Sequence, residues 1–323
     1  MERRAPSVFS SLVRVLHIIA VTVAALCFAT TGTAQALADL DASPIAVGAA
    51  RGLLGGALLA AAAWLIQRRT PGSLPWLPAM RSSRTAVALG VLGVLAYNAL
   101  FFVGTALNGV AVGTVVAIGS APVAAGALEA IVLRKPPQPR WMVATAVAII
   151  GVTLVAGLVN GQAAASGITI TGLLASIGAG SSYALYTFAS KSLFERGWST
   201  ATTMGTLFGL SGLLGAPILL VMDTAWLWTS RGIALTLWLS VVTVALAYSL
   251  WAWGLTGLRT TTVATLTLAE PMGATLLGLF VLSESLTGPA AIGVGFIALG
   301  LVIVALPSRR HHAISTLTPP TSP

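Results

Sequence analysis

Two stretches, "AIGSAPVAAGALEAIVL" (117–133) and "TLAEPMGATLLGLFVL" (267–282), decide the fold because they are two copies of one pattern. In each, a small or acidic residue and a proline lead into an apolar run rich in Gly, Ala and Leu. Laying Pro122 on Pro271 brings the copies into register. Each copy approaches the roughly 20 apolar residues that cross a bilayer, so the repeat predicts a duplicated membrane protein.

The register extends beyond the prolines. Gly151 of "AVAIIGVTLVAG" falls on Gly300 of "FIALGLVIVAL", and upstream "LAYNALFFVGTAL" resembles "LAYSLWAWGLTGL" at a slightly different offset. Repeats of this length indicate duplicated structural units. We therefore divide the chain into halves at 15–159 and 169–306.

Composition identifies the class of protein. Of the 323 residues, 56% are hydrophobic and 8% charged, and the mean hydropathy is +0.93, whereas a soluble domain carries about 25% charged residues. We expect an all-α integral membrane protein with ten transmembrane helices near 15–37, 45–66, 85–106, 110–133, 141–159, 169–190, 201–221, 233–254, 261–282 and 289–306.

Five spans per half is an odd number, so the second half must enter the membrane from the opposite face. Such inverted-topology repeats recur in secondary transporters, with the substrate site near the midplane between the halves. The first span also has the charge, apolar core and small-residue ending of a cleavable signal peptide. We retain it, because without it the span at 169–190 has no counterpart.

The positions of the basic residues predict the orientation. The net charge is +9, and fifteen of the 17 Lys and Arg residues lie before the first span, after the last, or in every second loop. The positive-inside rule then places both termini, 1–14 and 307–323, in the cytoplasm. The charge is therefore a topology signal and gives no support for nucleic-acid binding. The tail 307–323 is rich in Pro, Ser and Thr and is predicted to be disordered.

The chain resembles the drug/metabolite transporter superfamily, in particular its EamA-type exporters. The stretches at 111–133 and 260–286 carry the likeness, and "VGAARGLLGGALLA" (47–60) and "ALYTFASKSL" (184–193) resemble further parts of that pattern. Two positions depart from it: "LCFATTG" (26–32) lacks a tryptophan common among relatives, and no acidic turn follows the first copy. The resemblance implies export of a small metabolite across a bacterial inner membrane, with the first four spans of each half lining the pathway.

Charged side chains at membrane depth are costly and are functional candidates by default. Glu270 lies near the middle of its span, and because burial disfavours a charged carboxyl, it is a candidate proton coupler. A neutral acid that only holds helices together is the alternative. Arg51 could pair with Glu270 or a substrate carboxylate, or snorkel outward. For Glu129, one turn from the inner end of its span, we favour an interfacial anchor.

Amphipathic side chains at matching depths are candidates for the binding surface: Tyr97, Asn98, Tyr183, Tyr248 and Trp251. Tyr and Trp also mark membrane interfaces, so for Tyr183 the two interpretations stay open. An amide such as that of Asn98 needs partners at depth. Tyr186 and Trp253, and more weakly Thr30, Thr31 and Gln35, are further possibilities.

Two other residue types have mechanical roles in the prediction. A proline leaves the carbonyl four residues earlier unpaired, so Pro122 and Pro271 are candidate hinges or gates, although a fixed kink fits equally. Small residues four apart permit close helix packing, which assigns that role to the glycine pairs Gly52 and Gly56, and Gly205 and Gly209.

No motif for an enzyme is present. The sequence contains no G-x-x-x-x-G-K-[ST], no H-E-x-x-H and no G-x-S-x-G, so we expect no catalytic residue, cofactor or metal. The leading hypothesis is a secondary transporter for a small amphipathic solute, such as an amino acid or a drug. Uncoupled exchange competes with proton coupling, an intramembrane enzyme or lipid-handling protein and a non-transporting receptor are rivals, and a homodimer stays open.

Overall fold

The structure is a computed structural model that describes residues 8–70, 76–134, 137–155, 168–283 and 287–306. Every regular element in these ranges is helical. The helices are α1 (Val8–Ala38), α2 (Pro44–Arg69), α3 (Trp76–Ser82), α4 (Arg84–Leu133), α5 (Pro139–Val155), α6 (Ile170–Glu195), α7 (Thr200–Gly215), α8 (Ser230–Ser240), α9 (Ala247–Gly257), α10 (Thr260–Leu266), α11 (Ala269–Val281) and α12 (Gly288–Ala305). Two 3₁₀ segments (Ala216–Leu220 and Ala225–Trp228) and a π-helical segment (Val241–Leu246) complete the described elements.

Eight helical segments are long and apolar enough to cross a membrane, so the chain is a multi-pass membrane protein. They coincide with eight of the ten predicted spans. The other two correspond to α5, of which 17 residues are described, and to α6, which has 26 residues but carries many Ser, Thr and Tyr side chains. The predictions for 1–7 and for the tail 307–323 lie outside the described residues.

Helix α4 is a hairpin of two antiparallel arms, although its helical hydrogen bonding is continuous over 50 residues. A Cβ atom on Gly113 would lie 2.7 Å from the Cα of Thr105, whereas eight residues of straight helix extend about 12 Å. The arms, Arg84–Asn108 and Val112–Val132, are the third and fourth predicted spans.

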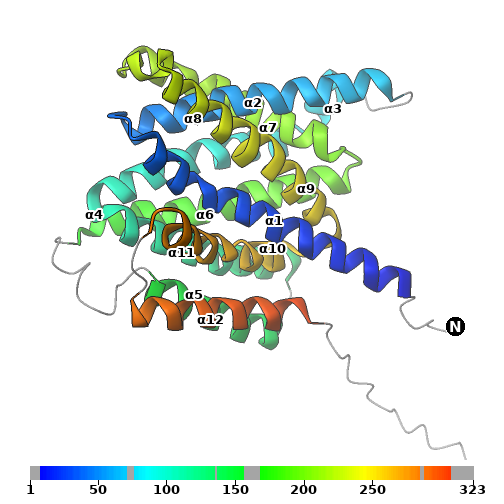
Figure 1. Cartoon of the computed structure of the whole chain (residues 1–323). Coiled ribbons are helices and arrows are strands. Elements are labelled where there is room, and N and C mark those ends of the chain that lie inside the picture. The colour runs from blue at the N-terminus through cyan, green and yellow to red at the C-terminus, as the bar shows by residue number, and fades with distance from the viewer. Residues whose placement is uncertain (1–7, 71–75, 135–136, 156–167, 284–286, 307–323) are drawn as a thin grey trace, which may run out of the picture.

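The two halves exchange their first helices. Helix α6 belongs to the second half but packs on both arms of α4, where Gly93 and Gly180 allow backbones to meet. Helix α1 belongs to the first half but packs on α9 and α11, where Gly254 and Gly273 meet it. In Figure 1, α1 runs diagonally across the molecule, between α2 above and α5 and α12 below. The exchange interlocks the halves.

The fifth helices of the halves, α5 and α12, pack on each other through the glycines that the repeat aligned. A Cβ on Gly151 would meet the carbonyl oxygen of Gly293 at 2.6 Å, and one on Gly300 would meet that of Ala144 at 2.7 Å. In the register of the repeat, Ala144 corresponds to Gly293. The two contacts are therefore images of each other, as a two-fold relation between halves requires.

Helices α2 and α7 pair in the same symmetric manner. Of the predicted packing glycines, Gly56, Gly205 and Gly209 face the backbone of the partner helix. Gly52 differs: its carbonyl lies against Gly212, but a Cβ on Gly52 would meet nothing within 4 Å. Gly52 therefore tolerates a side chain where the other three do not.

The two prolines behave differently in the structure. The helix that contains Pro271 is interrupted at Thr267 and Leu268, which separate α10 from α11. Helix α4 runs through Pro122 without interruption. The helices that contain the two prolines nevertheless end in the same way. Arg134 after α4 and Ser283 after α11 correspond in the repeat, and they have positive φ angles of 50° and 57°.

The helix ends that carry basic residues meet at one side of the molecule, which we call the basic side. Arg140 at the start of α5 donates to the carbonyl of Ile303 at the end of α12, and Lys191 at the end of α6 donates to that of Leu258 after α9. The ring of His17, in α1, stacks 4.7 Å from that of Trp253. In Figure 1 this side is at the right, where the N-terminus is marked.

The α2–α7 contact makes a direct prediction. Gly205→Leu should lower the free energy of unfolding by about 1–3 kcal/mol, the cost of overpacking, because its Cβ would lie 2.7 Å from that of Ala63 and 2.8 Å from the carbonyl oxygen of Leu59. Thermal unfolding in detergent measures this. Gly295→Leu is the matched control, since nothing lies within 4 Å of its Cβ position. Equal stability of the two variants would contradict the packing role.

Candidate functional site

A cavity of about 130 Å³ lies between the halves, away from the basic side. Its walls come from the end of α1, the start of α2, both arms of α4, and α6, α8, α9, α10 and α11. The lining residues are Phe28, Thr31, Gln35, Pro44, Val47, Gly48, Arg51, Tyr97, Asn98, Phe101, Phe102, Ala117, Ile118, Ala121, Tyr183, Tyr186, Leu239, Tyr248, Ala264, Thr267 and Glu270. Of the leading candidates for the binding surface, only Trp251 is absent from this lining, and of the further possibilities Trp253 and Thr30 are absent.

Arg51 and Glu270 are the charged residues of this cavity, and they come from different halves. They lie within electrostatic reach of each other, but neither side chain makes a hydrogen bond or ion pair with a described residue. An uncompensated charge pair at membrane depth is expensive. The arrangement suits a ligand that offers a group of each sign.

The helix break places Glu270 at the cavity wall. Pro271 cannot donate to the carbonyl of Thr267, and the N–H of Glu270 donates to it instead at 2.9 Å. Glu270 thus sits in the first turn of α11, where the partial positive charge of a helix N-terminus favours an anionic group.

A chain of hydrogen bonds forms the floor of the cavity. The indole N–H of Trp251 donates to the hydroxyl of Tyr183 at 2.9 Å, and that hydroxyl lies 3.0 Å from Oγ1 of Thr267. Thr267 in turn donates to the carbonyl of Val263 at 2.9 Å. Trp251 is fully buried beneath the floor, so its place in the structure is to orient Tyr183.

Aromatic rings form much of the cavity wall. The ring of Tyr183 lies 5.1 Å from that of Tyr186, and the ring of Tyr97 lies within 6.4 Å of both. Tyr248 packs 4.9 Å from Phe28 of α1. Among these rings, Asn98 donates its amide to Val94 at 2.9 Å. Its side-chain oxygen bonds to no described residue, which leaves it as an acceptor for a ligand.

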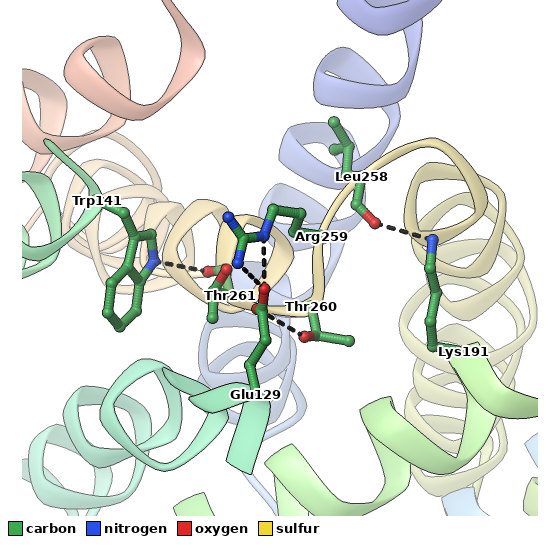
Figure 2. Close-up of polar contacts among 7 residues, drawn as sticks. All are labelled: Glu129, Trp141, Lys191, Leu258, Arg259, Thr260 and Thr261. Atoms are coloured by element: carbon green, nitrogen blue, oxygen red, sulfur yellow. Dashed lines mark hydrogen bonds and ion pairs between the residues drawn. The ribbon is translucent and has the colours of Figure 1, made fainter. Parts of the chain in front are cut away.

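The basic side is closed by an ion pair between the halves. Glu129, at the end of α4, is 3% exposed and accepts from the guanidinium of Arg259, which lies between α9 and α10. The hydroxyl of Thr260 adds a hydrogen bond to the same carboxylate at 3.3 Å. Figure 2 shows these groups converging. The interpretation of Glu129 as an interfacial anchor is therefore wrong, because the carboxylate points inward.

Two further contacts surround this ion pair (Figure 2). The indole N–H of Trp141, from α5, donates to the carbonyl of Thr261 at 3.1 Å and to Oγ1 of Thr265 at 3.0 Å. Lys191 satisfies carbonyls at the end of α9, including Leu255 at 2.8 Å. Together these contacts join both halves on the basic side.

The sequence interpretation missed Thr267, Phe101 and Phe102, and it held Gln35 and Thr31 only as weaker candidates. Thr267 had a usable signal, because it is the residue whose carbonyl Pro271 cannot bond. The Glu129–Arg259 pair had a signal as well: opposite charges were both predicted near the cytoplasmic ends of their spans.

Comparisons with known proteins agree with this architecture. Residues 15–157 and 170–306 each match the model of the EamA-like transporter family. The chain is 36% identical to the "Uncharacterized transporter YwfM" of Bacillus subtilis (strain 168), over 90% of this chain and 94% of that protein. It is 29% identical to the "Threonine/homoserine exporter RhtA" of Escherichia coli (strain K12), over 57% of this chain and 60% of that one. A crystal structure at 20% identity superposes with a TM-score of 0.71, covering 89% of this chain and 96% of that one, and shows the shared fold.

The ion pair on the basic side predicts non-additive stability. Arg259→Gln should destabilise the protein by about 1–3 kcal/mol, because it leaves the buried carboxylate of Glu129 without its charged donor. Glu129→Gln in addition should restore part of that loss. A double-mutant cycle on thermal unfolding measures the coupling. Additive effects of the two substitutions would show that the pair contributes no coupling energy.

Proposed function

The chain belongs to the EamA-like transporter family, and on that premise we propose that it is a secondary transporter that exports a small zwitterionic solute by alternating access. The observation that carries the proposal is that Arg51 and Glu270 line one cavity within electrostatic reach of each other, while neither side chain bonds to a described residue. A carboxylate of the solute binds Arg51, and an ammonium group binds Glu270. The name of the relative RhtA, a threonine/homoserine exporter, supports an amino acid or a close derivative.

The proposed topology has ten spans and both termini in the cytoplasm of a bacterial cell, with the chain in its inner membrane. The positive-inside rule then makes the basic side cytoplasmic. In this orientation the cavity opens outward, while the Glu129–Arg259 pair closes the cytoplasmic path. Alternating access requires that pair to separate when the cavity closes on its outer side.

Proton coupling follows from the position of Glu270. Among the residues that the structure describes, it is the one carboxyl that lines the cavity, and a solute ammonium and a proton compete for the same oxygen atoms. Protonation from outside therefore favours release of an exported solute, and return of the protonated carboxyl drives the next cycle. Exchange without protons is the alternative, in which only solute resets the transporter.

Glu270→Gln should abolish accumulation driven by a pH gradient and retain solute exchange, because the amide keeps the shape but cannot carry a proton. Reconstituted proteoliposomes and a panel of amino acids, with and without the gradient, measure both activities. Glu195→Gln, an exposed carboxyl at the end of α6 outside the cavity, is the matched control. Full gradient-driven flux in Glu270→Gln would show that Glu270 is structural and does not couple protons. Wild-type flux that does not respond to the gradient would favour uncoupled exchange, and no flux of any solute in the wild type would overturn the transporter proposal.

Arg51→Gln should raise KM for a transported amino acid by about tenfold or more, the value of a charge-assisted hydrogen bond. The same substitution should change KM for the amide of that amino acid little, because the amide lacks the carboxylate that Arg51 binds. Competition between the acid and the amide in the flux assay measures the difference. Equal effects on both compounds would show that Arg51 has a structural role.

A further inference from the structure

A second, larger cavity joins the first one sideways. It has a volume of about 550 Å³ and shares Gly48, Arg51, Tyr97, Asn98, Phe102, Tyr186 and Tyr248 with the polar cavity. We call it the lateral branch. Its remaining walls come from α2, the first arm of α4, α7, the 3₁₀ segment after α7 and Val244 of the π-helical segment.

The branch is polar at one end and apolar at the other. Arg51 is the one charged residue among the described residues that line it, and it lies where the two cavities meet. Ser211, a hydroxyl along its wall, already donates to the carbonyl of Val91 at 3.1 Å. The rest of the lining is mainly aliphatic, so the part of the branch beyond Arg51 offers a ligand apolar contacts.

The far end of the branch reaches the lipid-facing surface. Leu92, Leu214 and Ile218 line it and are 56%, 60% and 39% exposed. They belong to the first arm of α4, to α7 and to the segment after α7. A chain that extends from Arg51 through the branch therefore ends at the hydrocarbon of the bilayer and not in water.

A ring and a glycine mark the border between the two cavities. The ring of Phe102 lines both cavities and lies directly on Gly48, where any Cβ would overlap it. Gly52 lines the branch one turn further on, and a Cβ there would meet nothing within 4 Å. At Gly52, α2 therefore presents backbone without a side chain to the branch, which leaves space for a ligand.

We propose that the lateral branch receives the apolar chain of the transported solute, so that the substrate is a zwitterionic amphiphile with one unbranched apolar chain. The charged head lies between Arg51 and Glu270, and the chain passes Phe102 into the branch. This inference rests on the proposed function, because it extends the same binding site. It predicts that affinity grows with chain length well beyond the four carbons of threonine.

The test uses linear α-amino acids from four to ten carbons and the purified full-length protein in lipid nanodiscs, with empty nanodiscs to correct for partitioning. Each methylene that enters the branch should tighten binding by about fourfold, the equilibrium factor for about 0.8 kcal/mol per buried methylene. Affinity that does not change with chain length in the wild type would overturn the inference.

Gly52→Leu should remove the gain from chain length and keep the affinity for the four-carbon member, because its side chain fills the branch but not the polar cavity. Ala99→Leu, which enters the branch from the exposed face of α4, is a second variant that does not depend on α2. Gly295→Leu, with open space at its Cβ and no place in either cavity, should keep the wild-type dependence. An unaltered chain-length dependence in both branch variants would overturn the inference.

A bilayer lipid is the competing occupant. If a phospholipid co-purifies with the wild type, is lost in Gly52→Leu, and binding shows no chain-length dependence, the branch is a lipid site and the inference fails. Flux of the four-carbon member in proteoliposomes is measured in parallel. If the four-carbon member is transported but binding does not depend on chain length, the inference fails and the proposed function stands. If binding depends on chain length but no solute is transported, the branch still binds an apolar chain and the proposed transport function fails.

Discussion

The carbonyl of Thr267 is the constraint on which the rest of the site depends. Pro271 denies it an ordinary helical partner, and an unpaired carbonyl at membrane depth costs several kcal/mol. The chain meets this cost with a tight turn, in which Glu270 supplies the N–H. That turn places the Glu270 carboxyl at the cavity wall and leaves the Thr267 hydroxyl facing Tyr183, which Trp251 holds in place. The backbone N–H that Pro271 lacks thus determines the position of Glu270 in the cavity wall and of Thr267 in its floor.

In the proposed alternating access, the exchange of α1 and α6 lets the site change its access without losing its packing. Each half is held by a helix of the other half, and the direct helix pairs α2–α7 and α5–α12 are symmetric contacts through glycine. Glycine contacts bring backbones together without interdigitated side chains, so small sliding movements disrupt few rotamers. A two-fold arrangement also has two equivalent ways to tilt one half against the other, which is the requirement for alternating access.

Much of the fold followed from the sequence because it depends on periodic and repeated features. The repeat register located Gly151 and Gly300, whose contacts are symmetric in the structure, and the apolar runs located eight spans. The different behaviour of Pro122 and Pro271 could not be predicted, because only the tertiary setting of each helix decides whether it bends or breaks. The π-helical segment Val241–Leu246 was also missed. The Glu129–Arg259 pair was missed although both charges were placed near the cytoplasmic ends of their spans, because the packing of helices distant in sequence decides that they meet.

The two halves differ in the positions of their charged residues. Glu270 corresponds to Ala121 in the repeat, and Glu129 corresponds to Gly278. Symmetric packing contributes equally to both tilted states and cancels in their difference, so the asymmetric charges decide which state is preferred. In this conformation the pair Glu129–Arg259 is joined, while Arg51 and Glu270 lack partners. In the proposed function, a zwitterionic solute compensates the second pair, and its binding energy is thereby available to offset the separation of the first. On that proposal, solute binding and opening of the basic side are coupled through these charges.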